Sequence, residues 1–492
     1  MAEAEQFQKS LLATAPETKD LISEITDQMV KPGDESRGQI NNAIGFLLEE
    51  MLKPDRLGTR IDKKAVDQMI AEYDVRLSKQ VDQIMHSKEF QSLESTWRGL
   101  KLLVDRTDFR ENIKIEIINV SKDDLKEDFE DAPEIMKSGL YKTVYSANFA
   151  VRGGKPYGAI IGNYNFEPSS PDMALLAKVG SVATMSHAPF IAAAGPSFFG
   201  QESFEGLPNM NDLKDNLNTP RHTKWQAFRE SEDSRYVGLT MPRFLLRSPY
   251  SEEDNPVKGF TYNEDVSQSH EEYLWGNAAF AFASRLTEAF ASYRWCYNIT
   301  GPNAGGAVED LPVHTFESMG RETMKIPTEV SISDRRELEL AEEGFIPLVW
   351  RKDSDNAVFM GAQSALKPKT FGKSEEGKQA EANFKLGTRL PYMFVMSRIA
   401  HYLKTIQRES VQRGMSRAQM EGELQKWISQ YVAAMDVVDD ATRAKRPLRN
   451  AEVIVNDVDG DPGWYKVQLK VQPHIKFEGS YIDLSLVGKL DK

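Results

Sequence analysis

The chain has 492 residues, 40% of them hydrophobic, and a formal net charge of −13. That length predicts roughly two to four domains with a substantial core. The negative charge argues against a nucleic-acid-binding protein, because the phosphate backbone attracts basic surfaces. The single cysteine, Cys296, excludes an intrachain disulfide framework and fits a reducing compartment.

Neither a targeting segment nor a membrane span is visible in the sequence. The first ten residues, MAEAEQFQKS, lack the apolar stretch that a signal peptide needs. No run of about eighteen apolar residues occurs, and the nearest, Trp275–Trp295, is interrupted by Asn277, Arg285 and Arg294. We therefore expect a soluble, cytoplasmic protein without membrane insertion.

Residues 1–60 look like a loosely attached arm. Four apolar residues on Asp20–Val30 fall adjacent or one helical turn apart, namely Leu21, Ile22, Ile25 and Met29. The polar stretch KPGDESRG that follows breaks this stripe. So short a helix is marginal in water without a partner. Two readings stay open: a helix packed on the body of its own chain, or a linear motif displayed for the groove of another protein.

A region that combines helices and strands follows the arm. Helical spacing of apolar residues predicts two helices within Lys64–Val104, the second marked by Leu93, Trp97, Leu100 and Val104. Predicted strands and one helix then alternate in the order Ile113–Val120, Tyr157–Tyr164, helix Met173–Ser186 and Ala188–Ala194. This alternation indicates an α/β layer.

Further elements are expected toward the C-terminus. Strands are predicted at Tyr236–Thr240, Phe345–Trp350 and Ala357–Met360, and a helix at Tyr273–Trp295. The polar residues 367–387 read as a linker or surface loop. Two amphipathic helices follow. The first opens at Pro391 with a stripe of Val395, Ile399, Tyr402 and Ile406, and the second opens at Ser416 with a stripe of Met420, Leu424, Trp427, Tyr431 and Met435.

The last forty residues or so read as three strands joined by turns. They run Ala451–Val458, Trp464–Pro473 and His474–Val487. The period of two in Tyr465–Val471 puts apolar residues on one face and polar residues on the other. A hairpin is marginal alone, so it must lie on other strands or helices. Its outer edge also offers unpaired backbone groups to a strand of another chain, which indicates an assembly protein.

Motifs that resemble catalytic or binding sites each fail at a defining position. Gly372-Lys373-Ser374 resembles the end of a phosphate-binding loop, but Lys367 stands where the first glycine belongs. The seven histidines include no pair at a spacing of three or four residues, so no metal site is legible. We expect no catalytic residue, no cofactor and no metal, although one sequence hides residues that converge only in space.

The segment FQSLESTWRGLKLLVDRT, Phe90–Thr107, and the later block TMPRFLLRSPY resemble the large subunit of the type VI secretion contractile sheath, the TssC or VipB type. The resemblance extends from about residue 60 to the end of the chain. It implies an α+β, multidomain fold with a helical N-terminal arm, a mixed α/β middle region and a C-terminal phage tail-sheath-like domain that ends in a β-hairpin. The implied domains are 1–60, 61–380 and 381–492.

The resemblance also implies a structural protein with no enzymatic activity. Its expected partners are a small sheath subunit of the TssB or VipA type, other copies of itself, an inner tube of hexameric rings, a baseplate and a AAA+ unfoldase of the ClpV type. The sheath assembles extended, contracts to propel the tube, and is then dismantled by the unfoldase. Two alternatives stay open: a phage-type tail sheath that acts as a homopolymer, and a soluble α/β enzyme with a dispersed site.

Two sets of residues carry these expectations. The unfoldase is expected to bind the arm helix at Leu21, Ile22, Ile25 and Met29. Strands of neighbouring subunits are expected to interlace in the terminal sheet, through Val453, Val455, Tyr465, Val467, Leu469 and Val471.

Overall fold

The structure is a computed structural model. It describes residues 38, 42, 45, 63–151, 153–253, 256, 259–318, 320–372, 374–412, 415–434, 440–457, 465–474 and 484–488. The chain divides into two compact units. The smaller comprises Met1–Gln80 with Glu252–Tyr262, and the larger comprises Val81–Ser251 with Asn263–Lys492. The predicted arm lies outside the described residues, apart from three isolated positions. The three-domain division therefore stays a prediction.

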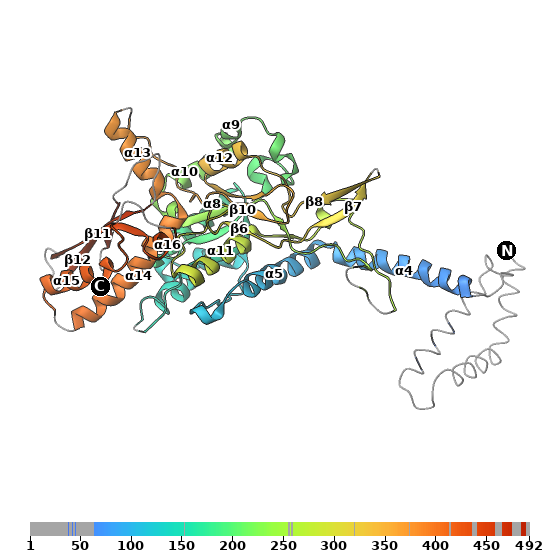
Figure 1. Cartoon of the computed structure of the whole chain (residues 1–492), viewed down its shortest axis with the longest axis horizontal. Helices are drawn as coiled ribbons and strands as arrows, with labels where there is room; N and C mark the ends of the chain where they lie inside the picture. The colour runs from blue at the N-terminus through green and yellow to red at the C-terminus, as the bar shows by residue number, and fades with distance from the viewer. Residues whose placement is uncertain are drawn as a thin grey trace, which may run out of the picture. The chain divides into compact units, whose positions relative to one another are not determined.

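A six-stranded sheet forms the centre of the larger unit (Figure 1). In spatial order its strands are β1 (Ile160–Phe166), β2 (Phe190–Ala194), β3 (Val237–Met241), β9 (Phe345–Trp350), β10 (Ala357–Phe359) and β6 (Ala307–Val308). The first four strands pair in parallel and the last two antiparallel, so β1 is an edge strand. The predicted strands of this region are confirmed, except for Ile113–Val120.

Helices cover both faces of this sheet because its strands are apolar on both sides. Along β2, Phe190, Ala192 and Ala194 join the hydrophobic cluster that contains α8 (Ser170–Ser186). Ile191, which points the other way, joins the cluster that contains α11 (Ala278–Tyr293). Both helices begin at a capping side chain, as helix starts require: Ser169 accepts from the amide of Asp172, and Asn277 accepts from the amide of Ala279.

The other helices are α4 (Lys63–Met85), α5 (Lys88–Asp105), α6 (Lys122–Asp131), α7 (Gly139–Tyr141), α9 (Leu213–Leu217), α10 (Thr223–Glu230), α12 (Asp334–Glu342), α13 (Glu375–Gly387), α14 (Leu390–Gln412), α15 (Arg417–Ser429) and α16 (Asp440–Lys445). Two small antiparallel pairs also form, β4 (Phe244–Leu245) with β5 (Trp275–Gly276), and β7 (His314–Ser318) with β8 (Arg321–Lys325). No helix among the described residues is long and apolar enough to cross a bilayer.

The C-terminal part of the larger unit contains a separate three-stranded sheet with its own helices. Its sheet has the order β11 (Leu448–Asp457), β12 (Tyr465–Pro473) and β13 (Leu484–Gly488), all antiparallel. The helices α14 and α15 lie beside it (Figure 1). The predicted strands Ala451–Val458 and Trp464–Pro473 and the α+β fold class are confirmed, whereas the strand predicted at His474–Val487 is described only as Leu484–Gly488.

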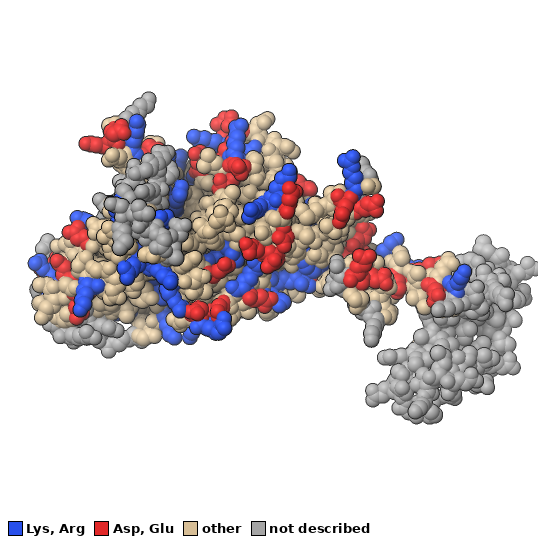
Figure 2. Space-filling view, in the orientation of Figure 1, with Lys and Arg blue, Asp and Glu red and all other residues tan. Residues whose placement is uncertain are grey.

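Two predictions of secondary structure are wrong. Residues 367–387 contain α13 instead of a continuous loop, because Ser374 caps a helix start by accepting from the amide of Gly377. The segment Ile113–Val120 has the alternation of a strand but pairs with no other strand of the described chain. On the face shown in Figure 2, acidic and basic side chains are interspersed over the larger unit.

Candidate assembly surfaces

The helix α5 is seated on the body through the buried Leu103 and through small and polar residues. Gly99 lies against Phe280 of α11 so closely that a Cβ atom there would stand 2.5 Å from the ring. Ser95 donates to the carbonyl of Trp275 at 2.8 Å, and Thr96 accepts from the amide group of Asn163 at 2.9 Å. Close approach of the two helices therefore depends on the absence of a side chain at Gly99.

A buried charge network fixes the same helix. Arg247 contacts Glu94 of α5 at 2.9 Å and also pairs with Glu264, whose side chain is almost fully buried. Arg98 donates to Glu94 at 2.7 Å. Burial alone would lower the pKa of Arg247, but its hydrogen bonds to Glu264 and Glu94 raise that pKa above the ordinary value. Arg247 therefore stays charged, and its bonds to Glu94 hold α5 in one orientation.

The opposite face of α5 is an exposed apolar stripe. Leu93, Trp97 and Val104 are 57%, 63% and 38% exposed, and the partly buried Leu100 lies between them. Their spacing of four, three and four residues places them in one line along the helix. A line of large apolar side chains that includes an exposed tryptophan is typical of a protein-binding surface. We call these four residues the α5 stripe.

The terminal sheet buries one face of alternating apolar residues. Across β11 and β12, Val453 lies opposite Leu469 and Val455 lies opposite Val467. All four are buried, as are Ala451 and Val471. They belong to the same hydrophobic cluster as Met420, Leu424 and Ile428 of α15. The predicted inward face of this sheet is therefore confirmed.

Side chains of α15 occupy the outer edge of β11. The amide of Val453 donates to Oε1 of Gln425 at 2.9 Å, and the Nε2 of Gln425 donates to the carbonyl of Ala451 at 2.9 Å. The amide of Val455 donates to Glu421 at 3.2 Å. These bonds satisfy backbone groups that an added strand would need. The outer edge of β11 is thus closed to another chain at this point.

Replacing Gln425 by alanine is expected to lower the free energy of unfolding by about 1–3 kcal/mol, because it leaves two backbone groups of β11 without a partner. Thermal or urea unfolding measures the change. Glu423→Ala on the exposed side of the same helix is the matched control and should change stability by less than about 0.5 kcal/mol. Equal effects of the two substitutions would contradict the capping role.

The strand β12 lies between β11 and β13, so both of its edges are paired within the chain. The amide of Val453 points away from β12, toward Gln425. In an antiparallel ladder the amide of the opposite residue, Leu469, then points away from β11 and toward Leu486 of β13. The same reasoning applies to Val467. These two residues therefore hold β13, and the outer edge of β13 pairs with no described strand.

The predicted site residues occupy different places. Val453 and Val455 lie in β11, whose outer edge is closed. The remaining strand residues, Tyr465, Val467, Leu469 and Val471, lie in the central strand β12. The predicted unfoldase-binding residues Leu21, Ile22, Ile25 and Met29 lie outside the described residues. The α5 stripe was not predicted as a surface, since its spacing is also that of an ordinary core-facing helix.

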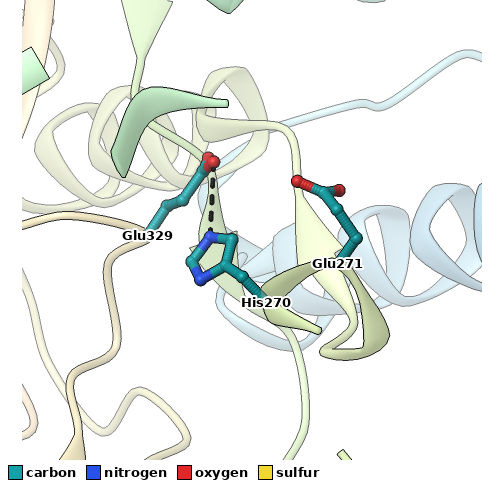
Figure 3. A group of neighbouring side chains, drawn as sticks. All are labelled: His270, Glu271 and Glu329. Carbon is teal, nitrogen blue, oxygen red and sulfur yellow. Dashed lines mark ion pairs between the residues drawn. The ribbon is translucent and has the colours of Figure 1, made fainter. Parts of the chain in front are cut away.

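A cluster of His270, Glu271 and Glu329 has ligand atoms of the kinds that bind metal ions, all within 4.8 Å of one another (Figure 3). The ring of His270 points toward Glu329, with Nε2 3.4 Å from Oε1. However, Arg243 donates to both carboxylates, and the Nζ of Lys325 lies 2.8 Å from Nδ1 of His270. Two positive groups within the cluster oppose a bound cation, so its chemistry is that of an ion-pair network.

The same cluster predicts sensitivity to acid. Burial alone would raise the pKa of Glu329, but hydrogen bonds from Arg243 and the nearby ring of His270 lower it from 4.5 to about 2. Because the pKa of Glu329 is lower in the folded than in the unfolded chain, its carboxylate stabilises the fold at pH values above 4.5. That stability is lost as the pH falls from 4.5 toward 2. We expect a loss of about 3 kcal/mol in urea unfolding over this window. Glu329→Gln should make the free energy of unfolding depend less steeply on pH in this window. An unchanged slope would contradict the role given to Glu329.

Comparison with known proteins identifies the family to which this chain belongs. Residues 67–366 match the family model described as the EvpB/VC_A0108 tail sheath N-terminal domain. Residues 379–490 match the tail sheath gpW/gp25-like domain of the same family. The chain is 39% identical over 482 residues to the type VI secretion system sheath protein TssC1 of Pseudomonas aeruginosa, covering 97% of this chain and 96% of the relative. The chain therefore belongs to the VipB family of type VI secretion sheath proteins, as a large subunit of the TssC type.

Proposed function

We propose that this chain pairs with a small sheath subunit in the cytoplasm and polymerises on a baseplate around an inner tube of hexameric rings. The sheath then contracts and propels the tube. The single observation that carries the pairing is the α5 stripe, an apolar line exposed on a helix whose other face is fixed by Gly99 and Arg247. A surface held so firmly and left uncovered suits a permanent partner, because little conformational entropy is lost when the partner binds.

The terminal sheet is proposed to link neighbouring subunits. The strand β13 pairs with β12 along an antiparallel backbone ladder, and residues 474–483 lie between the two strands. The same ladder forms equally well when β13 comes from a neighbouring copy or when a strand of the small subunit takes its place, because main-chain hydrogen bonds do not depend on which chain supplies the strand. Such a link survives rotation of one subunit against the next.

Contraction is proposed to draw on energy stored during assembly. The extended lattice is then metastable, and the contracted lattice buries more surface between subunits, so each chain acts as a two-state interface element. The arm residues Leu21, Ile22, Ile25 and Met29 are proposed to bind a AAA+ unfoldase of the ClpV type once the sheath has contracted. Calorimetry that found the extended lattice to be the more stable form would contradict the stored-energy account.

Electron microscopy of the chain co-expressed with its small subunit tests the proposal. A helical tube that contains the two chains in equal numbers is the expected result, and either chain alone should form no tube. A tube built from this chain alone would favour a phage-type homopolymer. Persistent monomers with a bound small molecule would favour an enzyme. Either outcome would overturn the proposed pairing.

A further inference from the structure

The segment Ile113–Val120, with the sequence IKIEIINV, has the composition of a strand but no strand partner. Within the described part of the chain, the amides and carbonyls of residues 113–119 make no hydrogen bond to other residues. The carbonyl of Val120 accepts only from the hydroxyl of Tyr164 at 2.8 Å. A run of β-branched residues with its backbone groups unused is unusual, since strands of this composition normally pair.

In the middle of the segment Ile113–Val120, side chains on both of its faces are exposed to solvent. Ile117 is 66% exposed and its neighbour Ile118 is 49% exposed. Successive side chains of an extended backbone point in opposite directions. Neither of the two is therefore turned into the core. Ile115, by contrast, packs against the hydrophobic cluster formed by Leu103 of α5 with Phe280 and Ala283 of α11. Through Ile115 the segment is thus attached to the cluster that also holds the inner side of α5.

Side chains, not backbone bonds, connect the segment to the edge of the six-stranded sheet. Tyr164 of β1 reaches the carbonyl of Val120, and Tyr157, just before β1, bonds the carboxylate of Glu116. Each contact is made by the far end of a tyrosine side chain. The two backbones therefore do not stand at the spacing of about 4.8 Å that paired strands adopt. The outer edge of β1 also pairs with no strand that the structure describes.

We propose that Ile113–Val120 is a receiving strand, which pairs through its backbone with an extended, alternately apolar segment of the small sheath subunit. The inference rests on the proposed pairing and names a second contact in it. A second copy of this chain is the poorer occupant, because the same strand on two copies pairs about a two-fold axis and closes a dimer. The small subunit, seated on the α5 stripe, is within reach because Ile115 packs against the cluster that contains Leu103 of that helix.

Hydrogen–deuterium exchange of the co-purified complex tests this inference. A strand added on one side protects every second amide, so alternate amides of residues 113–120 should exchange at least about 100-fold more slowly in the complex than in the chain alone. The exposed residues 369–372 are the control and should exchange equally in both samples.

The variants Ile117→Pro and Ile118→Pro supply a second test, with copurification of the small subunit as the measurement. Only one of two successive amides faces the incoming strand, so one proline should weaken copurification at least about tenfold more than the other. Ile117→Thr and Ile118→Thr keep the amides and the strand propensity, and they should retain binding.

The outcomes separate the inference from the proposed function. Alternating protection in a complex that forms supports the receiving strand. A complex that forms while residues 113–120 exchange freely overturns the receiving strand and leaves the pairing intact. Protection already present in the chain alone assigns the segment to a part of the same chain and overturns the partner. Failure of the small subunit to bind overturns both.

Discussion

A chain carrying Trp97→Lys is expected to lose its small subunit while keeping its fold. Trp97 is 63% exposed, so the isolated chain gives up almost no packing when the ring is removed. In the complex the same ring would lie at the centre of the α5 stripe, where a buried tryptophan contributes about 2–4 kcal/mol to binding. That loss corresponds to an affinity about 30- to 1,000-fold weaker. Copurification with a tagged small subunit, followed by titration, measures the effect.

The control for this substitution is Leu338→Lys. Leu338 is 59% exposed on α12, so it matches Trp97 in exposure and chemistry but lies on another helix. It should bind the small subunit as the unmodified chain does. Circular dichroism and melting temperature should be unchanged for both variants. If Trp97→Lys binds normally, the α5 stripe is not the contact surface, and the observation that carries the proposed pairing is removed.

Proline at Leu469 is expected to prevent tube formation although the body of the chain still folds. The amide of Leu469 faces Leu486 of β13, so proline there removes a donor from the β12–β13 ladder and leaves a carbonyl without its partner, at a cost of about 1–3 kcal/mol. The β11–β12 ladder keeps its donors at this position, because the opposite amide, that of Val453, bonds Gln425. Electron microscopy of the co-expressed chains gives the result directly.

Two further variants show whether the donor or the side chain matters. Leu469→Val removes about the same amount of apolar surface but keeps the amide, and it should still form tubes. Lys470→Pro breaks the β11–β12 ladder instead, because the amide of Lys470 points toward Glu452. We expect that variant to unfold the terminal sheet in the single chain. Normal tubes from Leu469→Pro would refute a linking role for this ladder.

The elements of the larger unit follow from local sequence signals. Alternation predicts β11 and β12 with their inward faces, and a proline in the first turn of α8 helps to mark where that helix begins. The α13 helix was missed because its residues are polar and its cap, Ser374, lies inside a stretch that reads as a loop. Propensity alone undervalues a helix whose start is fixed by a side-chain cap.

The sequence does not predict which face of α5 packs on the body of the chain. Apolar spacing normally marks the face of a helix that packs on the core. Here the core-facing side combines the buried Leu103 with Ser95, Thr96 and Gly99, whose small size permits close contact with α11 and β1. Their role depends on residues far away in the sequence, such as Phe280 and Arg247. The same limitation applies to Ile113–Val120, whose strand-like pattern gives no sign that a partner strand is absent.

The side chains of Gln425 and Glu421 leave the terminal sheet with only one edge that can accept a further strand. A sheet with one blocked margin and one open margin grows toward one side only. If neighbouring subunits are joined through this sheet, each chain donates to the next in the same sense, and a head-to-head joint has no place to form. A row of subunits would then carry a fixed polarity from its first member, and a pull applied at one end would pass along the row through joints of a single kind.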